Sequence, residues 1–358
     1  MGSTHTAGQP DSTTPAIDER RVSEPQRTAV HGPAMRAIIQ DRYGTVDVWR
    51  LGETATPDIA ANEVLVQVRA AGLDRGTWHL MTGQPYLMRI MGFGFRRPKN
   101  RSPGLDVAGV VAAVGADVTR FQPGDEVFGI ARGSFAEYAA AREDKLAHKP
   151  TNLSFEQAAV VPISGSTALQ AVRDTGRVEA GQKVLVVGAS GGVGTYAVQL
   201  ATASGAHVTG VCSTTKVDLV RSIGADHVID YTREDFADGS RRYDLILDIA
   251  GNPSLTRLRR ALRPRGTAVF VGGEDAGVLI GMGRQLRGVL LSAFVKQRLA
   301  LLVAKESASD YARLTDLIEA GRLVPSIDRT YPLEDAPLAV RQLEAGHVRG
   351  KIAITIDR

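Results

Sequence analysis

A glycine-rich turn is the part of this sequence whose residue types most clearly indicate chemistry. The apolar run 183–187 (KVLVV) leads directly into 188–194 (GASGGVG), and 195–201 have the pattern of an amphipathic helix. In a dinucleotide-binding turn, small residues permit a tight bend, the approach of a pyrophosphate and close packing of helix against strand. The pyrophosphate would bind backbone N–H groups at the helix N-terminus. The alternative is a strand–helix turn that binds nothing. We expect five residues of the turn to contact a dinucleotide: Ala189, Gly191, Gly192, Val193 and Gly194.

The end of the next apolar segment bears on which nicotinamide cofactor binds. Enzymes that use NAD usually have Asp or Glu at this point, where it binds the ribose 2′-hydroxyl. Here residues 207–212 are followed by Ser213, two threonines and Lys216, with no carboxylate. Hydroxyl groups and an ammonium group can instead hold a 2′-phosphate, although Ser213 and Thr214 also suit a helix cap. We therefore expect NADPH, with Ser213 and Lys216 among its contacts.

Candidate proton donors lie far from the glycine turn in the sequence. Asp74, Thr77 and His79 are close together, and a histidine can titrate near neutral pH. Each also has an ordinary structural role, because Asp74 suits a helix cap and His79 a surface or packed position. Water is a further proton source. We take these three as the candidate catalytic residues. The loop 83–101 beyond them holds Tyr86, other aromatic residues and a basic run, which suit either an apolar pocket that attracts an anionic substrate tail or a solvated loop.

The composition is that of an ordinary globular protein and excludes several classes. Apolar residues make up 43% and charged residues 23% of the 358 residues, and the net charge is +4 with both signs interspersed. We therefore expect no nucleic-acid partner. No apolar run is long enough to span a membrane, so no membrane partner is expected, and we find no signal-peptide core. Cys212 is the single cysteine, which indicates a reducing compartment and a cytoplasmic location.

The segments that must position these residues change in character along the chain. Residues 1–34 are rich in Ser, Thr, Pro and Gly and predict a disordered tail. Short strands with Gly and Pro turns predict a β-rich unit over 35–155. Apolar strands alternate with helical stretches over 156–297, which predicts a doubly wound parallel sheet. Residues 298–358 need a sheet to join, and the β-rich unit is the expected host. The predicted fold class is α/β, with a discontinuous substrate domain (35–155 and 298–358) and a cofactor domain (156–297).

Several segments together resemble one known family. The segments PGLDVAGVV at 103–111, FQPGDEV at 121–127, GSFAEY at 133–138 and GKI at 350–352 occur in family order around the glycine turn. From Met35 to Ile356 the chain thus resembles medium-chain dehydrogenases/reductases of the zinc-free quinone oxidoreductase-like branch. The resemblance implies a GroES-like substrate domain, a Rossmann domain, an active site between them and a possible homodimer.

The same resemblance implies cofactor contacts outside the glycine turn. Tyr231 would lie near the adenosine phosphate, Lys351 would reach the cofactor phosphates, and Phe294 would hold the carboxamide. Turn geometry alone is the alternative for the glycines of this set, and core packing is the alternative for Phe294. The full set is Ser166, Thr167, Tyr231, Gly251, Gly272, Phe294 and Lys351.

The resemblance also bears on metal. Zinc alcohol dehydrogenases of this superfamily have Cys, His and a later Cys or Asp where this sequence has Asp74, Leu105 and Ile163. A catalytic zinc normally has three protein ligands, so we expect no metal. Hydride addition to a conjugated C=C bond or a quinone needs no metal, only an oriented nicotinamide and a proton. We expect NADPH-dependent reduction of such a small molecule. The alternatives are a zinc-free NAD(P)-dependent alcohol or aldehyde dehydrogenase, or a non-catalytic NADPH-binding protein.

Overall fold

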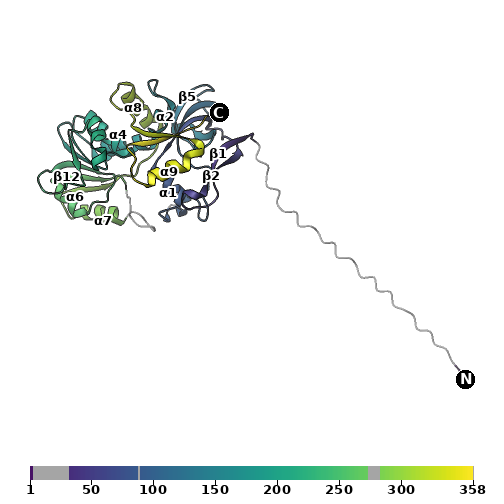
Figure 1. Ribbon diagram of the computed structural model, residues 1–358, viewed down its shortest axis with the longest axis horizontal. Helices are drawn as coiled ribbons and strands as arrows, with labels where there is room; N and C mark the ends of the chain where they lie inside the picture. Colours follow the sequence, from purple (N-terminus) through teal and green to yellow (C-terminus); the bar gives the residue numbers. More distant parts are fainter. Residues whose placement is uncertain (3–31, 88, 273–282, 358) are drawn as a thin grey trace. The chain divides into compact units, whose positions relative to one another are not determined.

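A six-stranded parallel sheet carries the glycine turn in the computed structural model (Figure 1). The spatial order is β10-β9-β8-β11-β12-β13, and every adjacent pair is parallel. The first strand in sequence thus lies in the middle, as in a doubly wound Rossmann sheet, which confirms the predicted fold class. The strands are β8 (Lys183–Val187), β9 (His207–Cys212), β10 (His227–Asp230), β11 (Tyr243–Asp248), β12 (Leu262–Phe270) and β13 (Arg298–Leu301).

Strand β8 shows why the strands of this sheet are continuous apolar runs in the sequence. Val184 and Val186 pack in one buried cluster with residues of the helix that follows the turn. Leu185 and Val187 pack in a second cluster, together with Leu258 from the other face. Both faces are therefore covered, as in parallel sheets generally. The helices of this part of the chain are α2 (Phe155–Ala159), α3 (Pro162–Gln170), α4 (Gly192–Ala203), α5 (Val217–Ser222), α6 (Leu255–Ala261) and α7 (Gly283–Ser292).

A second large sheet brings together segments from both ends of the described chain. Its order is β14-β15-β3-β4-β5-β7, and β6 also pairs with β3. The last strand, β15, lies antiparallel to β3, with Ile352 opposite Leu73. A separate hairpin is formed by β1 (Ala34–Gln40) and β2 (Trp49–Ala55). The strands of the second sheet are β3 (Glu63–Leu73), β4 (Asp106–Val114), β5 (Glu126–Ile130), β6 (Tyr138–Arg142), β7 (Leu146–His148), β14 (Ile327–Pro332) and β15 (Lys351–Thr355).

One apolar cluster joins the two sheets. It contains Phe128 from the second sheet, Val186 from the parallel sheet and Leu314 from α8 (Ala308–Glu319), all buried. Burial of this much apolar surface is the main favourable term in holding the two sheets together. As a result, β4 and β15 are fixed beside the glycine turn.

The structure corrects the predicted boundary at residue 298. Arg298–Leu301 forms β13, which lies parallel to β12 as the sixth strand of the Rossmann sheet. Leu299 is buried in the same cluster as Phe270, so its apolar side chain packs under that sheet. The chain therefore leaves the parallel sheet only after residue 301.

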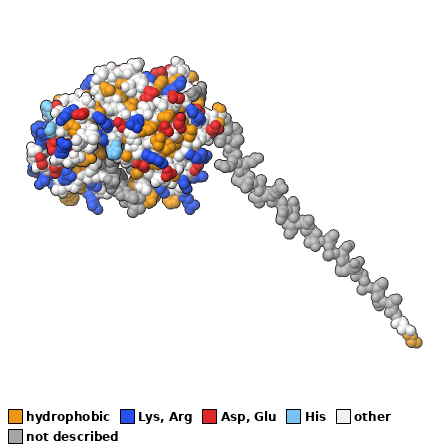
Figure 2. Space-filling model, viewed as in Figure 1, with side chains coloured by type: hydrophobic (Ala, Val, Ile, Leu, Met, Phe, Trp, Pro, Cys, Tyr) orange, Lys and Arg blue, Asp and Glu red, His pale blue; other side chains and the backbone are white. Residues whose placement is uncertain are grey.

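The structure describes residues 1–2, 32–87, 89–272 and 283–357. Most of the predicted tail, 1–34, lies outside these ranges. Within them, no helix is both long and apolar enough to cross a bilayer. On the face drawn in Figure 2, basic and acidic side chains are interspersed, as the sequence indicates. The two remaining helices are α1 (Arg75–Thr82) and α9 (Ala336–Glu344).

Candidate cofactor and active site

The glycine turn has one crowded side and one open side. Gly188 has a φ of +84°, and an ideal Cβ at Gly194 would lie 2.1 Å from the Gly188 carbonyl oxygen, so both positions require glycine. An ideal Cβ at Gly191 would meet only that same oxygen, at 3.5 Å. Gly191 is also the N-cap of α4, whose first N–H groups have no intrahelical acceptor. The turn therefore fits a pyrophosphate on the open side of Gly191.

Strand β15 is attached directly to this turn. The Gly350 N–H donates to the Ser190 carbonyl at 2.8 Å, and Gly191 and Gly350 form a parallel bridge. The Lys351 side chain is 2% exposed and passes so close to Gly192 that an ideal Cβ there would lie 2.8 Å from Lys351 Cδ. Lys351 thus lies against the turn, and its contact with the cofactor phosphates, which the resemblance implies, stays a prediction.

The ammonium of Lys351 has a carboxylate partner that the sequence analysis did not foresee. Its Nζ lies 3.3 Å from Asp106 Oδ2, and the Asp106 side chain is fully buried. Asp106 Oδ1 accepts a hydrogen bond from the Ile163 N–H at 2.9 Å. Burial raises the pKa of Asp106 to about 7, and the Asp74 carboxylate adds to that rise while Lys351 opposes it. Asp106, Lys351 and Asp74 therefore form one buried, electrostatically coupled group beside the turn.

Asp74 is a helix cap, the structural role considered for it, but only through one oxygen. Its Oδ1 accepts from the Thr77 N–H at 2.7 Å at the start of α1. Asp74 Oδ2 and the hydroxyl of Thr77 are buried, and neither has a hydrogen-bond partner in the described part of the chain. Buried polar atoms are normally paired, so these two atoms are the candidates for contact with a further group.

His79 occupies a different part of α1. It lies in the last turn, where its Nδ1 is 2.8 Å from the Gln84 carbonyl oxygen. Its ring packs edge-on against Trp78 at 5.0 Å. These contacts support a packed structural position, whereas Asp74 and Thr77 are brought together at the start of the helix.

The end of β9 has a neighbouring carboxylate that was not predicted from the sequence. Asp230 ends β10 directly opposite Cys212, so a carboxylate lies beside this strand end although none follows it in sequence. Thr214 donates to Asp230 Oδ2 at 2.5 Å and Thr232 to Oδ1 at 2.7 Å. These hydrogen bonds, that of Thr214 first, lower the pKa of Asp230. The hydroxyl of Thr214 is therefore engaged by Asp230 rather than free to hold a phosphate.

The other predicted residues at this strand end remain on the surface. Ser213 is the N-cap of a short 3-10 turn, but its side chain makes no capping hydrogen bond. Lys216 Nζ donates to the Gly346 carbonyl at 2.8 Å, and Tyr231 is exposed. Arg233, absent from the predicted set, lies 3.5 Å from Asp230 with an exposed guanidinium. The strand end thus presents two cations and a tyrosine.

The predicted nicotinamide contacts are only partly brought together. Ser166 is buried on α3 and donates to the Pro162 carbonyl at 2.6 Å, and Thr167 is half-buried beside it. Gly251 has open space beside it, whereas an ideal Cβ at Gly272 would lie 2.2 Å from a backbone oxygen. Phe294 is 85% exposed, so neither core packing nor a place in the cluster around Asp106 is observed for it.

A second buried carboxyl group lies where β11 ends. Asp248 pairs with Val187, the last residue before the glycine turn. Its side chain is 1% exposed and lies 2.7 Å from Arg284. Burial raises the pKa of Asp248 to about 6 despite this cation. The Asp248–Arg284 pair could not be predicted from the sequence, because nothing near Asp248 indicates an arginine partner from α7.

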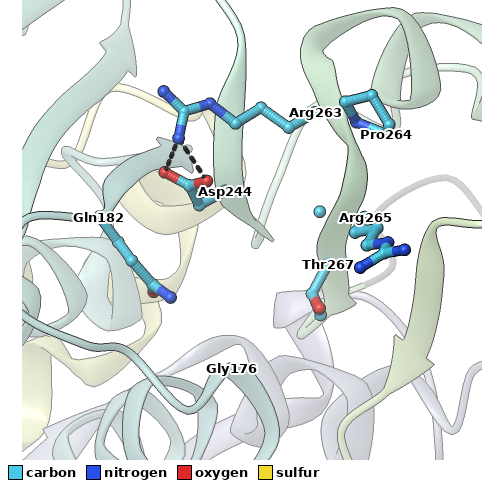
Figure 3. Close-up of a pocket in the computed structure, with 8 residues that line it drawn as sticks. Gly176, Gln182, Asp244, Arg263, Pro264, Arg265 and Thr267 are labelled. Carbon is cyan, nitrogen blue, oxygen red and sulfur yellow. Dashed lines mark hydrogen bonds and ion pairs between the residues drawn. The ribbon is translucent and has the colours of Figure 1, made fainter.

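A hollow in the parallel-sheet part of the chain lies elsewhere (Figure 3). It measures about 420 Å³ and is lined by residues where the parallel strands begin, including Gln182, Asp244 and Thr267. Ligands of open α/β sheets bind instead beyond the carboxyl ends of the strands. Arg263 turns toward Asp244 and donates to both carboxylate oxygens, at 2.7 and 2.9 Å. We therefore assign the site to the glycine turn and not to this hollow.

Comparison with known proteins agrees with this architecture. The family model of the alcohol dehydrogenase GroES-like domain matches residues 60–151, and that of the zinc-binding dehydrogenases matches 223–354. The mitochondrial NAD(P)H oxidoreductase RTN4IP1 of Mus musculus is 32% identical over 92% of this chain and 91% of its own length. The 2-methylene-furan-3-one reductase of Solanum lycopersicum is also 32% identical, over 89% of this chain and 79% of its own.

A solved structure extends the likeness to the fold. The quinone oxidoreductase from Coxiella burnetii superposes with a TM-score of 0.80 at 29% identity, covering 91% of this chain and 100% of that one. The relatives cover about nine tenths of this chain, whereas the two family models match parts of both sheets and leave out the glycine turn. This chain therefore belongs to the medium-chain dehydrogenase/reductase superfamily, among its quinone oxidoreductase-like members, and is an oxidoreductase.

Proposed function

We propose that this protein reduces a conjugated C=C bond or a quinone by hydride transfer from NADPH, without a metal ion. The observation that carries the proposal is the glycine turn, whose open side at Gly191 fits a pyrophosphate and whose backbone is bridged to Gly350, just before β15. When bound, the reduced nicotinamide supplies the hydride, which no side chain can supply. Relatives named NAD(P)H oxidoreductase and 2-methylene-furan-3-one reductase support this reaction class.

The preference for NADPH rests on the charges at the end of β9. Lys216 and Arg233 are cations at the surface there, with Ser213 and Tyr231 beside them. The nearby Asp230 is held by two threonine hydroxyls and by Arg233, and so is not free to bind a ribose hydroxyl as in NAD enzymes. Fluorescence titration should give a lower Kd for NADPH than for NADH. The substitution Lys216→Gln should raise the Kd for NADPH and leave the Kd for NADH unchanged. Tighter binding of NADH would reverse the assignment.

The donor set near Asp74 does not suit zinc. No group of three or more His, Cys, Asp or Glu side chains that could hold a metal occurs in the described ranges. Asp106 is already paired with an ammonium, and among the described residues no imidazole or thiolate joins the two carboxyl groups in a possible metal site. Zinc sites normally combine three such ligands. Elemental analysis of the purified protein should find no stoichiometric zinc, although one matching family model is named for zinc-binding dehydrogenases.

The proton that completes reduction needs a source inside the protein or water. Asp106 can hold a proton near neutral pH because burial raises its pKa to about 7. Asp74 Oδ2 is buried and unpartnered within the described residues, and it interacts electrostatically with Asp106. We assign Asp74 to passing the proton and Asp106 to holding it. Asp74→Asn should lower kcat about a hundredfold with little change in the Kd for NADPH, whereas an unchanged kcat would favour water.

A panel of enones, quinones, aldehydes and alcohols tests the reaction class. NADPH consumption on enones or quinones is the expected result. Turnover of aldehydes or alcohols alone would favour the dehydrogenase alternative. Binding of NADPH without turnover of any compound would favour a non-catalytic role.

A further inference from the structure

The segment that begins with α1 and continues beyond it carries only basic charge. From Arg75 to Leu105 the sequence has no Asp or Glu. Residues 276–305 are another stretch without Asp or Glu, whereas charges of both signs are interspersed on the face drawn in Figure 2. The cations of this segment are Arg75, Arg89, Arg96, Arg97, Lys99 and Arg101.

The first part of this segment is anchored to the fold by Arg89. Its guanidinium lies between the rings of Tyr43 and Tyr86, 4.4 and 4.6 Å from their centroids. It also donates to the carbonyl oxygens of Thr82 and Gly83 at the end of α1. Arg89 is therefore committed to structure and is not available to an external partner.

The second part is a tight turn that only glycine permits. Gly94 has a φ of +111°, and an ideal Cβ there would lie 2.1 Å from the Arg97 carbonyl oxygen. The Lys99 N–H donates to the Phe93 carbonyl at 2.9 Å, and the Tyr43 hydroxyl donates to the Gly94 carbonyl at 2.7 Å. The side chains between Gly94 and Lys99 are therefore displayed on a fixed turn.

This turn, together with Ile90 four positions before it, presents apolar and basic side chains outward. Ile90 is 72% and Phe95 70% exposed. Arg96, Arg97 and Lys99 are exposed, and within the described chain no hydrogen bond or ion pair of their side chains is observed. We call Ile90, Phe95 and these three cations the basic loop. Exposed apolar side chains rimmed by polar residues mark protein or membrane interaction sites.

We propose that the basic loop docks the protein on a bilayer surface rich in anionic lipids. Ile90 and Phe95 would insert at the boundary of headgroups and acyl chains, while the three cations would lie at the level of the lipid phosphates. A bilayer fits better than an acidic protein because side chains exposed by 70% or more protrude and form no groove for a partner to fill. This goes beyond the expectation of no membrane partner, which rested on the absence of a spanning segment.

The position of the basic loop, after the helix that holds candidate catalytic residues, suits access to a substrate dissolved in the bilayer. It follows α1, whose first turn holds the candidate residues Asp74 and Thr77. If the proposed function holds, docking brings that end of the protein to a hydrophobic enone or quinone dissolved in the bilayer. Docking itself needs neither cofactor nor substrate, so it can be tested separately from the reaction.

Co-sedimentation of the full chain with vesicles is the first test. The protein should pellet with vesicles of mixed phosphatidylglycerol and phosphatidylcholine, and remain in solution with phosphatidylcholine alone. R96Q/R97Q/K99Q should lower the partition coefficient about a hundredfold, and I90S/F95S at least about tenfold. Circular dichroism and the Tm should match the wild type, which separates loss of docking from loss of folding.

Matched variants control for the basic charge of the whole protein. R69Q/R265Q/R287Q removes the same number of charges from other exposed positions, and V303S/L338S removes two other exposed apolar side chains. Both should bind vesicles like the wild type. No binding to anionic vesicles, or equal losses in the control and basic-loop variants, would overturn the proposal.

Insertion is tested by a fluorescent reporter. Phe95→Trp should be quenched by brominated lipids in anionic vesicles, beyond the quenching of Trp49 and Trp78 in the wild type. Binding that needs the cations but shows no such quenching, and no effect of I90S/F95S, would overturn bilayer insertion and leave only electrostatic attachment to the lipid headgroups.

Discussion

Two ion pairs at opposite ends of the Rossmann strands show how burial changes the role of the same chemistry. Lys351 and Asp106, beside the glycine turn, are 2% and 0% exposed. Arg263 and Asp244, at the hollow where the strands begin, are 47% and 22% exposed, and their contact is shorter, at 2.7 Å against 3.3 Å. Distance alone would rank the exposed pair higher. Desolvation reverses that order, because a buried charge without its partner is costly whereas an exposed one is solvated.

Of the changes considered, removing one partner of each ion pair should give the largest difference between the two regions in the free energy of unfolding. Lys351→Met leaves the Asp106 carboxyl buried without its cation and should lower the free energy of unfolding by about 3 kcal/mol. Urea unfolding monitored by circular dichroism measures this loss. The double variant K351M/D106L should recover part of it, and a loss in K351M as small as that of an exposed pair would contradict the comparison.

The buried pair should also give stability a pH dependence. Burial raises the pKa of Asp106 from 3.8 to about 7, so between these values the folded protein binds more protons than the unfolded chain. The contribution of Asp106 to the free energy of unfolding therefore falls as pH rises from about 4 to about 7. The difference between wild type and Asp106→Asn, measured by urea unfolding at each pH, should show this negative slope. A flat difference would mean that Asp106 stays ionised throughout.

A substitution on the open side of the glycine turn should weaken NADPH binding but leave the stability of the fold unchanged. Gly191→Ala places a methyl group where the protein leaves 3.5 Å or more of space, so Tm should hardly change. The same methyl group would meet a bound pyrophosphate, and the Kd for NADPH should rise about tenfold, or 1.4 kcal/mol. Gly194→Ala is the matched control, since its Cβ would clash with the backbone and should lower Tm as well.

The exposed pair should give the smallest effect. Arg263→Met breaks the contacts to Asp244, but both groups reach water, so the free energy of unfolding should change by less than about 1 kcal/mol. NADPH binding should be unaffected, because the hollow lies where the strands begin. A tenfold change in Kd on this substitution would show that the hollow is coupled to the cofactor site.

The sequence predicted the features whose residues are contiguous. The glycine turn is a strand, a run of small residues and a helix within one short segment, so its residue types alone specify the geometry. The helix cap at Asp74 and the alternation of strands and helices are local in the same sense. The missed features depend on partners far apart in sequence. Asp106 and Lys351 are separated by 245 positions, and Asp230 reaches the end of β9 only through strand pairing.

The predicted boundary at residue 298 was wrong for a related reason. A short apolar strand has the same residue pattern whichever sheet it joins. Only the pairing of β13 with β12 shows that it belongs to the Rossmann sheet. Phe294 follows α7 and is exposed, so the core-packing alternative is wrong. Its predicted contact with the cofactor stays a prediction.

By itself, the amino-acid sequence determined the fold class and the position of the dinucleotide turn, because backbone geometry and apolar periodicity are local properties. The tertiary structure alone decided which carboxyl groups are buried, which cation faces them and which side chains protrude at the basic loop. Those properties depend on solvent exclusion, and solvent is excluded only when distant segments of the chain pack together.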